Sequence, residues 1–132
     1  MTGLLAAYRR TAYEAAGAVA RIGRRAPEID ALLRRLGARQ GAFVTAWNPW
    51  SRRVPAGRNA RMMQRLREAA RRLPAAEGEG KGQGWSERHL LLAADPRRAA
   101  ALARRFRQNA MVVARVGAPA RLALLRPTPA PG

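Results

Sequence analysis

Residues 88–96 read RHLLLAADP, and this stretch decides the predicted fold. Its short apolar run is typical of a buried strand. Asp95 and Pro96 predict the start of a helix, because an Asp side chain accepts hydrogen bonds from free backbone amides and proline suits the first turn. The apolar residues that this helix is expected to bury recur at helical spacing: Ala99, Leu102, Ala103 and Phe106. A strand that leads into an amphipathic helix indicates a fold of mixed type.

Toward the C-terminus, residues 110–116 (AMVVARV) and 120–125 (ARLALL) predict two antiparallel strands. The Gly-Ala-Pro sequence between them is suited to a turn. Residues 127–132 (PTPAPG) are predicted to be a disordered Pro-rich tail, which leaves residues 1–126 as a single domain.

Toward the N-terminus, residues 58–73 predict a helix that Pro74 ends, with one apolar face formed by Met62, Leu66, Ala69, Ala70 and Leu73. Residues 77–84 (EGEGKGQG) are expected to form a flexible hairpin connection or a mobile loop, with a short strand around residues 75–77. Residues 41–47 (GAFVTAW) predict a buried strand that ends at Asn48-Pro49, because proline lacks a donor for the sheet.

The first forty residues are less decisive. Pro27 predicts the start of a short helix, and Gly37 provides a left-handed residue to stop it. Residues 4–11 form a short amphipathic stretch, whereas the periodicity of residues 13–22 leaves helix and strand open. The whole order predicts an α+β fold, a largely antiparallel sheet with helices packed on one face. It resembles a ferredoxin-like split β-α-β-β-α-β unit with an N-terminal strand/helix addition.

The 132-residue chain has 26 Lys and Arg against 8 Asp and Glu, so its formal net charge is +18. Lys81 is the only lysine, and a GC-rich coding sequence would explain the preference for Arg. The small number of acids is a separate feature, which predicts attraction to nucleic acid, most simply RNA or a ribonucleoprotein, or to an acidic protein. The residues expected to contact phosphate lie along two predicted helices: Arg58, Arg61, Arg65, Arg72, Arg97 and Arg104.

Composition also excludes several classes of site. The chain has no Cys and a single His, so Cys-based zinc sites, iron–sulfur clusters and thiol nucleophiles are excluded. We expect no metal and no cofactor. No apolar run approaches the roughly 20 residues that a membrane span needs. The first ten residues have the wrong order for a secretory signal, so we expect a cytoplasmic protein without membrane contact. Nothing in the sequence indicates its oligomeric state.

Polar residues and tryptophans cluster where predicted strands meet helices, in the motifs TAWNP, WSE and QNA. Turns and helix caps explain such residues, and so does a ligand pocket. Asn59 illustrates both interpretations, as the N-cap of a helix or as part of an anion site beside Arg58 and Arg61. A ligand site requires all of them to converge in space, and its candidate residues are Thr45, Asn48, Ser51, Asn59, Trp85, Glu87, Gln108 and Asn109.

Glu87 and His89 are two residues apart on a predicted strand, so their side chains face the same side. They are the weak candidates for a catalytic acid and base. The simpler interpretation is an ordinary strand whose Glu pairs with a neighbouring Arg, so the sequence favours a binding protein over an enzyme. We therefore expect a basic domain that binds nucleic acid or another phosphate-bearing ligand. The alternative is a small-molecule-binding protein or modest enzyme with a polar pocket.

The same motifs identify a resemblance to a family. FVTAWNPWS at residues 43–51, Asn59, the glycines that precede WSE at residues 85–87, and FRQNAMVV at residues 106–113 resemble the small bacterial proteins of domain of unknown function 3293. Members have a strand before the first long helix, which favours a strand at residues 18–22. The chain departs from the family pattern at Arg88-His89 and at Arg107. The resemblance implies no particular activity, cofactor or catalytic residue.

Overall fold

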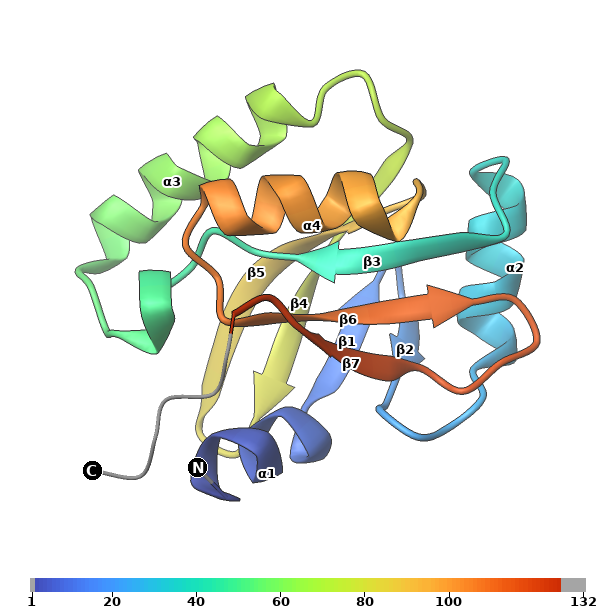
Figure 1. Ribbon diagram of the computed structural model, residues 1–132, viewed down its shortest axis with the longest axis horizontal. Helices are drawn as coiled ribbons and strands as arrows, with labels where there is room; N and C mark the ends of the chain where they lie inside the picture. Colours follow the sequence, from blue (N-terminus) through green and yellow to red (C-terminus); the bar gives the residue numbers. More distant parts are fainter. Residues whose placement is uncertain (1, 127–132) are drawn as a thin grey trace.

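The computed structural model describes residues 2–126, arranged as a curled sheet with helices on both of its faces (Figure 1). Met1 and the predicted tail at residues 127–132 lie outside the described residues. The helices are α1 (Thr2–Arg10), α2 (Pro27–Arg35), α3 (Ala56–Ala69) and α4 (Pro96–Arg105), with a short 3-10 helix η1 (Pro49–Ser51). The strands are β1 (Ala12–Ala15), β2 (Ala18–Ala20), β3 (Gln40–Val44), β4 (Ala75–Gly82), β5 (Trp85–Leu92), β6 (Ala110–Arg115) and β7 (Arg121–Leu124).

All neighbouring strands are antiparallel, in the order β2-β1-β4-β5-β3-β6-β7. The four central strands β4-β5-β3-β6, with α3 and α4 as their connections, have the order of a split β-α-β-β-α-β unit. The α+β class is therefore confirmed. The N-terminal addition is the β1–β2 hairpin, which continues the sheet beyond β4.

The sheet curls until its two edges meet at one point. A parallel bridge joins Ile22, just after β2, to Ala120, just before β7. The Gly23 amide donates to the Ala120 carbonyl at 2.7 Å, and the Ala120 amide donates to the Arg24 carbonyl at 3.1 Å. This curvature gives the sheet a concave face, on which the first and last strands pack in one cluster.

The two faces of the sheet carry separate cores. On the convex face, α3 and α4 pack against Val44, Leu90 and Leu92, among other residues. On the concave face, Ile29 and Leu33 of α2 pack against the strand residues that lie between those convex-face residues in the sequence, whose side chains point to the other side of the sheet. The prediction that the helices share one face therefore holds for α3 and α4 but not for α2, because curling creates a second apolar surface that α2 covers.

The prediction of a hairpin with a strand at residues 75–77 was correct, but the strand continues to Gly82, so the hairpin connection is only residues 83–84 and the mobile-loop alternative was wrong. β4 pairs with β5 along its whole length. Its glycines allow close approach, since a Cβ at Gly78 would overlap the backbone of Glu14 and Ala15 on β1. Glycine here permits tight pairing rather than flexibility.

Several local predictions were tested directly. Residues 12–20 form a hairpin, which resolves the open choice in favour of strand. Asp95 caps α4 as predicted, accepting a hydrogen bond from the Arg97 amide at 2.8 Å. The predicted apolar face of the helix at residues 58–73 packs on the core, with Leu66 and Ala70 fully buried, but the prediction omitted Met63, which is buried more deeply than Met62. Within residues 2–126, the helices are all too short or too polar to cross a membrane.

Candidate functional site

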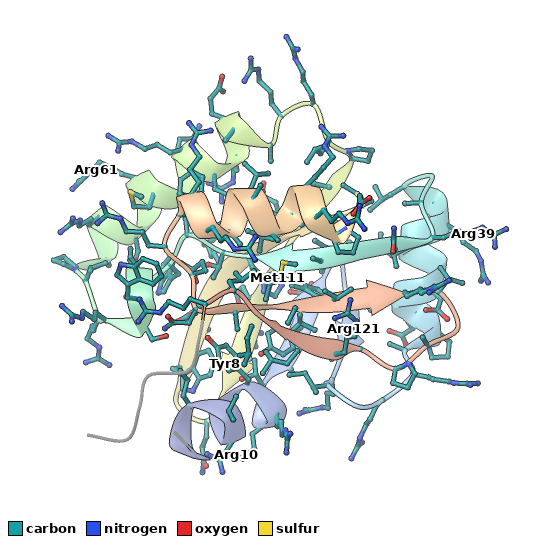
Figure 2. The ribbon with its side chains drawn as sticks, viewed as in Figure 1. Tyr8, Arg10, Arg39, Arg61, Met111 and Arg121 are labelled. Carbon is teal, nitrogen blue, oxygen red and sulfur yellow. The ribbon has the colours of Figure 1, made fainter. Side chains whose placement is uncertain are left out.

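A cavity of about 180 Å³ lies on the concave face, at the end that α2 does not fill. Its walls come from α1, from strands β1, β3, β4, β5 and β6, and from the loop that contains η1. Figure 2 shows Tyr8 between α1 and the sheet, with Met111 of β6 above it. Residues from opposite ends of the chain therefore meet at this place.

Aromatic residues are concentrated around the cavity. Aromatic residues make up only 5% of the chain, yet all of them except Trp50 and Phe106 line this space. The aromatic lining residues are Tyr8, Tyr13, Phe43, Trp47 and Trp85. Large rigid side chains of this kind form the walls of many ligand sites, with a few polar groups to orient the ligand.

Most of the candidate polar residues lie at the same cavity. Six of the eight candidate ligand-binding residues line it: Thr45, Asn48, Ser51, Trp85, Glu87 and Gln108. The remaining two, Asn59 and Asn109, each hydrogen bond to a lining residue. The requirement that these residues converge in space is therefore met.

Asn59 holds Asn48 through a pair of amide hydrogen bonds. The Asn48 backbone N–H donates to Asn59 Oδ1 at 2.8 Å, and Asn59 Nδ2 donates to Asn48 Oδ1 at 3.0 Å. Asn48 Oδ1 also accepts from the Val54 amide at 3.1 Å. Asn59 is not the N-cap of α3, as one interpretation proposed, because the helix already begins at Ala56. Its buried side chain instead shapes the loop.

The loop after β3 has an unusual backbone that other residues hold in place. Asn48, Trp50 and Ser51 all have φ between 44° and 61°, the left-handed region that side chains usually avoid. The Trp50 amide donates to the Arg107 carbonyl at 2.7 Å, and Asn109 Nδ2 donates to Ser51 Oγ at 2.8 Å. Residues that follow α4 thus fasten the loop over the cavity.

Two other candidates serve structural bonds. Thr45 Oγ1 donates to the Arg88 carbonyl and accepts from the Trp47 amide, at 2.6 and 3.0 Å. Gln108 Nε2 donates to the carbonyls of Trp47 and Phe106, each at 3.2 Å. The Thr45 hydroxyl and the Gln108 amide therefore stabilise the wall of the cavity through these hydrogen bonds.

Glu87 is the acidic side chain of the cavity wall. Asn48 Nδ2 donates to its Oε1 at 3.3 Å. Burial raises the pKa of Glu87, and the Asn48 hydrogen bond opposes this by stabilising the ionised form. Burial likewise raises the pKa of Tyr8, with a hydrogen bond from Ser51 acting against it and the charge of Glu87 adding to it.

His89 faces the cavity beside Glu87, as the two-residue spacing predicts, but it is deeply buried and already bonded. Its Nε2 donates to the Glu14 carbonyl at 2.6 Å in the neutral tautomer with a proton on Nε2. The ring lies against Tyr13 and Phe43, with centroids 6.2 and 4.9 Å away. Burial lowers the pKa of His89, so the neutral ring is favoured. This environment explains His89 as part of an aromatic core.

The predicted phosphate-contacting arginines lie elsewhere. All six are exposed on or beside α3 and α4, which cover the opposite face of the sheet. Sequence reasoning missed a different group, Arg9, Arg10, Arg21 and Arg24, which line an open groove that also includes Trp85. The groove adjoins the cavity, because Ala7 and Trp85 line both. The adjacent arginines at Arg9-Arg10 and Arg24-Arg25 could have indicated a basic surface, but only the folded structure brings the two segments together.

Possible metal ligands are sparse. In the described part of the chain, His, Asp and Glu side chains form no group of three that could hold a metal ion. The chemistry available at the cavity is therefore that of one carboxyl group, hydroxyl and amide groups, the His89 imidazole and aromatic rings, with Arg88 also in the lining.

The chain matches a known family over about half of its length. The model of a family described as "Protein of unknown function (DUF3293)" matches residues 44–111. This segment runs from the end of β3 into β6 and includes Asn48, Asn59, Glu87 and Gln108. No curated protein and no solved structure matched the chain.

Proposed function

We propose that this chain, which belongs to the DUF3293 family, is a small-molecule-binding domain whose ligand occupies the concave-face cavity. The observation that carries this proposal is the convergence of the TAWNP, WSE and QNA motifs on one cavity. These motifs are separated by tens of residues in the sequence and do not form one continuous element. Packing alone does not require amide, hydroxyl and carboxyl groups to gather there.

The cavity limits the size of the ligand. An apolar protein cavity of about 150 Å³ accommodates benzene. At about 180 Å³, the cavity here suits a compact molecule with one ring and a short substituent. The aromatic walls favour an apolar body, and Glu87 and Tyr8 offer polar groups to orient it.

The loop geometry supports a binding role. Left-handed backbone at Asn48, Trp50 and Ser51 costs on the order of 1 kcal/mol or more per residue. The amide pair of Asn48 and Asn59 holds this conformation before any ligand arrives. Such preorganisation lowers the ordering cost of binding.

The test uses benzyl alcohol as a probe and a variant that fills the cavity. Ala7→Leu adds volume on α1 at the cavity wall, whereas Ala101→Leu adds the same volume on the exposed side of α4. In amide and indole NMR spectra, benzyl alcohol should shift the signals of Trp47 and Trp85 in the wild type and in Ala101→Leu. Ala7→Leu should weaken binding by at least about tenfold.

Benzyl alcohol that shifts no cavity signal, or that binds Ala7→Leu as well as the wild type, would contradict the proposal. Thermal unfolding of both variants verifies that the fold is intact.

A second candidate function, binding of RNA, is favoured by the arginine groove. Its lining contains four arginines and no acidic residue, and Trp85 beside them is 42% exposed. Arginine contacts to phosphate and stacking of bases on an exposed aromatic ring are the usual means of holding single strands. The exposed arginines of α3 and α4 offer a competing surface.

Fluorescence anisotropy with a single-stranded RNA oligomer separates the two surfaces. The slope of log affinity against log salt should fall by about 0.7 for each phosphate of a single strand that an arginine no longer neutralises. We expect Arg9→Gln with Arg10→Gln to reduce the slope more than the matched pair Arg61→Gln with Arg65→Gln. The reverse order would assign binding to α3, and no salt-dependent binding would refute this function.

A further inference from the structure

Glu87 lacks a cationic partner in a protein with a large excess of cations. Among residues 2–126, the acid–base ion pairs are Arg67–Glu77, Arg71–Glu68 and Lys81–Glu79, none of which includes Glu87. Arg88, its neighbour on β5, also lines the cavity but forms no ion pair with Glu87, because adjacent side chains of a strand face opposite sides of the sheet. The partner of Glu87 is the neutral amide of Asn48.

The carboxyl group of Glu87 has acceptor capacity left over. An ionised carboxylate offers about four lone-pair positions, and the hydrogen bond from Asn48 uses one of them. In the described residues, every fully buried polar side-chain atom has a partner. The unused capacity of Glu87 is therefore at the accessible wall of the cavity, where a ligand would meet it.

The rings around the cavity favour the same kind of ligand. The faces of aromatic rings carry partial negative charge and attract cations. Tyr8, Trp47 and Trp85 line the cavity together with Glu87. A carboxylate ligand would be repelled by Glu87, and a purely apolar ligand would remove water from the carboxyl group without replacing its hydrogen bonds.

We propose that the cavity binds a small organic cation, a protonated primary amine on a compact apolar body, with its ammonium group on Glu87 and its body against the aromatic walls. This inference rests on the proposed function. The net charge of +18 does not forbid it, because exposed charges are screened beyond about 8 Å at physiological salt. The cation is recognised locally, inside the cavity.

The test compares three probes of similar shape: benzylamine, benzyl alcohol and benzoate, titrated into the full chain at 150 mM salt and neutral pH. We expect benzylamine to bind at least tenfold more tightly than benzyl alcohol, and benzoate to bind least. Glu87→Gln preserves the size of the side chain and an acceptor for Asn48 while removing the charge. It should abolish the preference for benzylamine, with at least a tenfold loss of benzylamine affinity and a much smaller loss of benzyl alcohol affinity.

A matched control is Glu68→Gln, which removes an exposed carboxylate on α3 far from the cavity lining. It should leave the order of the three probes unchanged. A second measurement needs no variant: in the wild type, benzylamine affinity should fall as the pH is lowered and Glu87 becomes protonated, whereas benzyl alcohol affinity should fall much less.

The outcomes separate the two proposals. If benzyl alcohol binds the cavity as tightly as benzylamine, and Glu87→Gln changes neither, the cation inference is overturned while the proposed function stands. If none of the three probes binds at the cavity, both proposals fail.

Discussion

The two faces of the sheet are built from the same strands but differ in what their side chains do. On β5, Leu90 and Leu92 point to the convex face, where α3 and α4 cover them completely. On the concave face, Leu91 packs under α2, whereas His89 and Glu87 continue into the cavity. The convex face thus supplies packing, and one end of the concave face supplies polar and aromatic chemistry. Because side chains alternate along β5, one set of its residues packs in the convex core and the other set reaches the cavity.

The difference extends to the backbone. On the convex side, α4 begins with an ordinary helix cap at Asp95. The loop over the cavity contains left-handed residues held by side-chain amides. Strain of this kind persists only where the surroundings over-determine it, which is common at ligand sites.

The largest expected effect on stability comes from disrupting the pairing of β4 with β1, which extends the sheet to the N-terminal hairpin. Gly78→Ala places a Cβ against the backbone of Glu14 and Ala15. We expect the free energy of unfolding to fall by about 4 kcal/mol. This exceeds the usual cost of overpacking, because backbone atoms cannot move aside as a side chain can. Gly57→Ala on α3 would place its Cβ 3.8 Å from Arg61 Nη1, an ordinary van der Waals contact, and should be neutral or stabilising by about 0.5 kcal/mol. Urea unfolding measures both, and equal effects would contradict the assignment of β4 as a tightly paired strand.

The next effect isolates the convex face. Leu66 on α3 is fully buried, and Leu66→Ala should lower the free energy of unfolding by about 3 kcal/mol through reduced burial and the cavity left behind. Binding of benzyl alcohol at the concave cavity should be unchanged in the folded protein. A large change in affinity would show that the two faces are not independent.

A smaller effect on stability, coupled to binding, is expected at the cavity loop. Asn59→Ala removes the amide pair with Asn48 and should cost about 2 kcal/mol, since buried polar groups lose their partners. Benzyl alcohol affinity should fall as well, because Asn48 also bonds to Glu87. Gln64→Ala, on the exposed side of α3, is the control and should alter neither quantity. An Asn59→Ala protein with normal affinity would exclude a role in positioning the loop.

The smallest effect is pH dependent and belongs to the concave face. His89 has a pKa lowered by burial from the ordinary value of 6.5, so the unfolded chain binds its proton at a higher pH than the folded one. Stability from this group is therefore present above pH 6.5 and is lost as the pH falls through the folded pKa. His89→Phe should remove this part of the pH dependence in urea unfolding between about pH 5 and 8.

Because the chain has one His, its ring signals in NMR report this titration without ambiguity. Titration of His89 above its ordinary pKa in the folded protein would reverse the expected sign and contradict its burial as a neutral ring.

Local signals predicted the parts of the fold that local physics controls. Asp95-Pro96 marked the start of α4, and Gly37, with φ of 79°, follows α2 as a left-handed stop. The apolar segment at residues 41–47 contains most of β3. The glycines of β4 misled the prediction, because the same residue permits a mobile loop and close strand packing. The partner that decides between them, β1, lies about sixty residues away.

For the candidate site, the sequence marked the polar residues but not their setting. Amide and tryptophan motifs stood out from an Ala- and Arg-rich composition, and six of the eight candidates line the cavity. Tyr8 and Tyr13 were not among them, since an isolated Tyr in an N-terminal segment carries no pattern. The choice of Arg58 and Arg61 on α3 likewise missed the groove beside the cavity, which forms only when distant segments meet.

By itself, the sequence determined most of the element types, the α+β class and the excess of positive charge, because these depend on periodicity, capping and composition within short stretches. Only the tertiary structure decided which face α2 covers, how far β4 extends, and that Glu87 stands among aromatic rings without an ion pair. The physical reason is that curvature of the sheet brings α1, β1 and the loop after β3 to one place. Curvature arises from many long-range pairings, which no local pattern encodes.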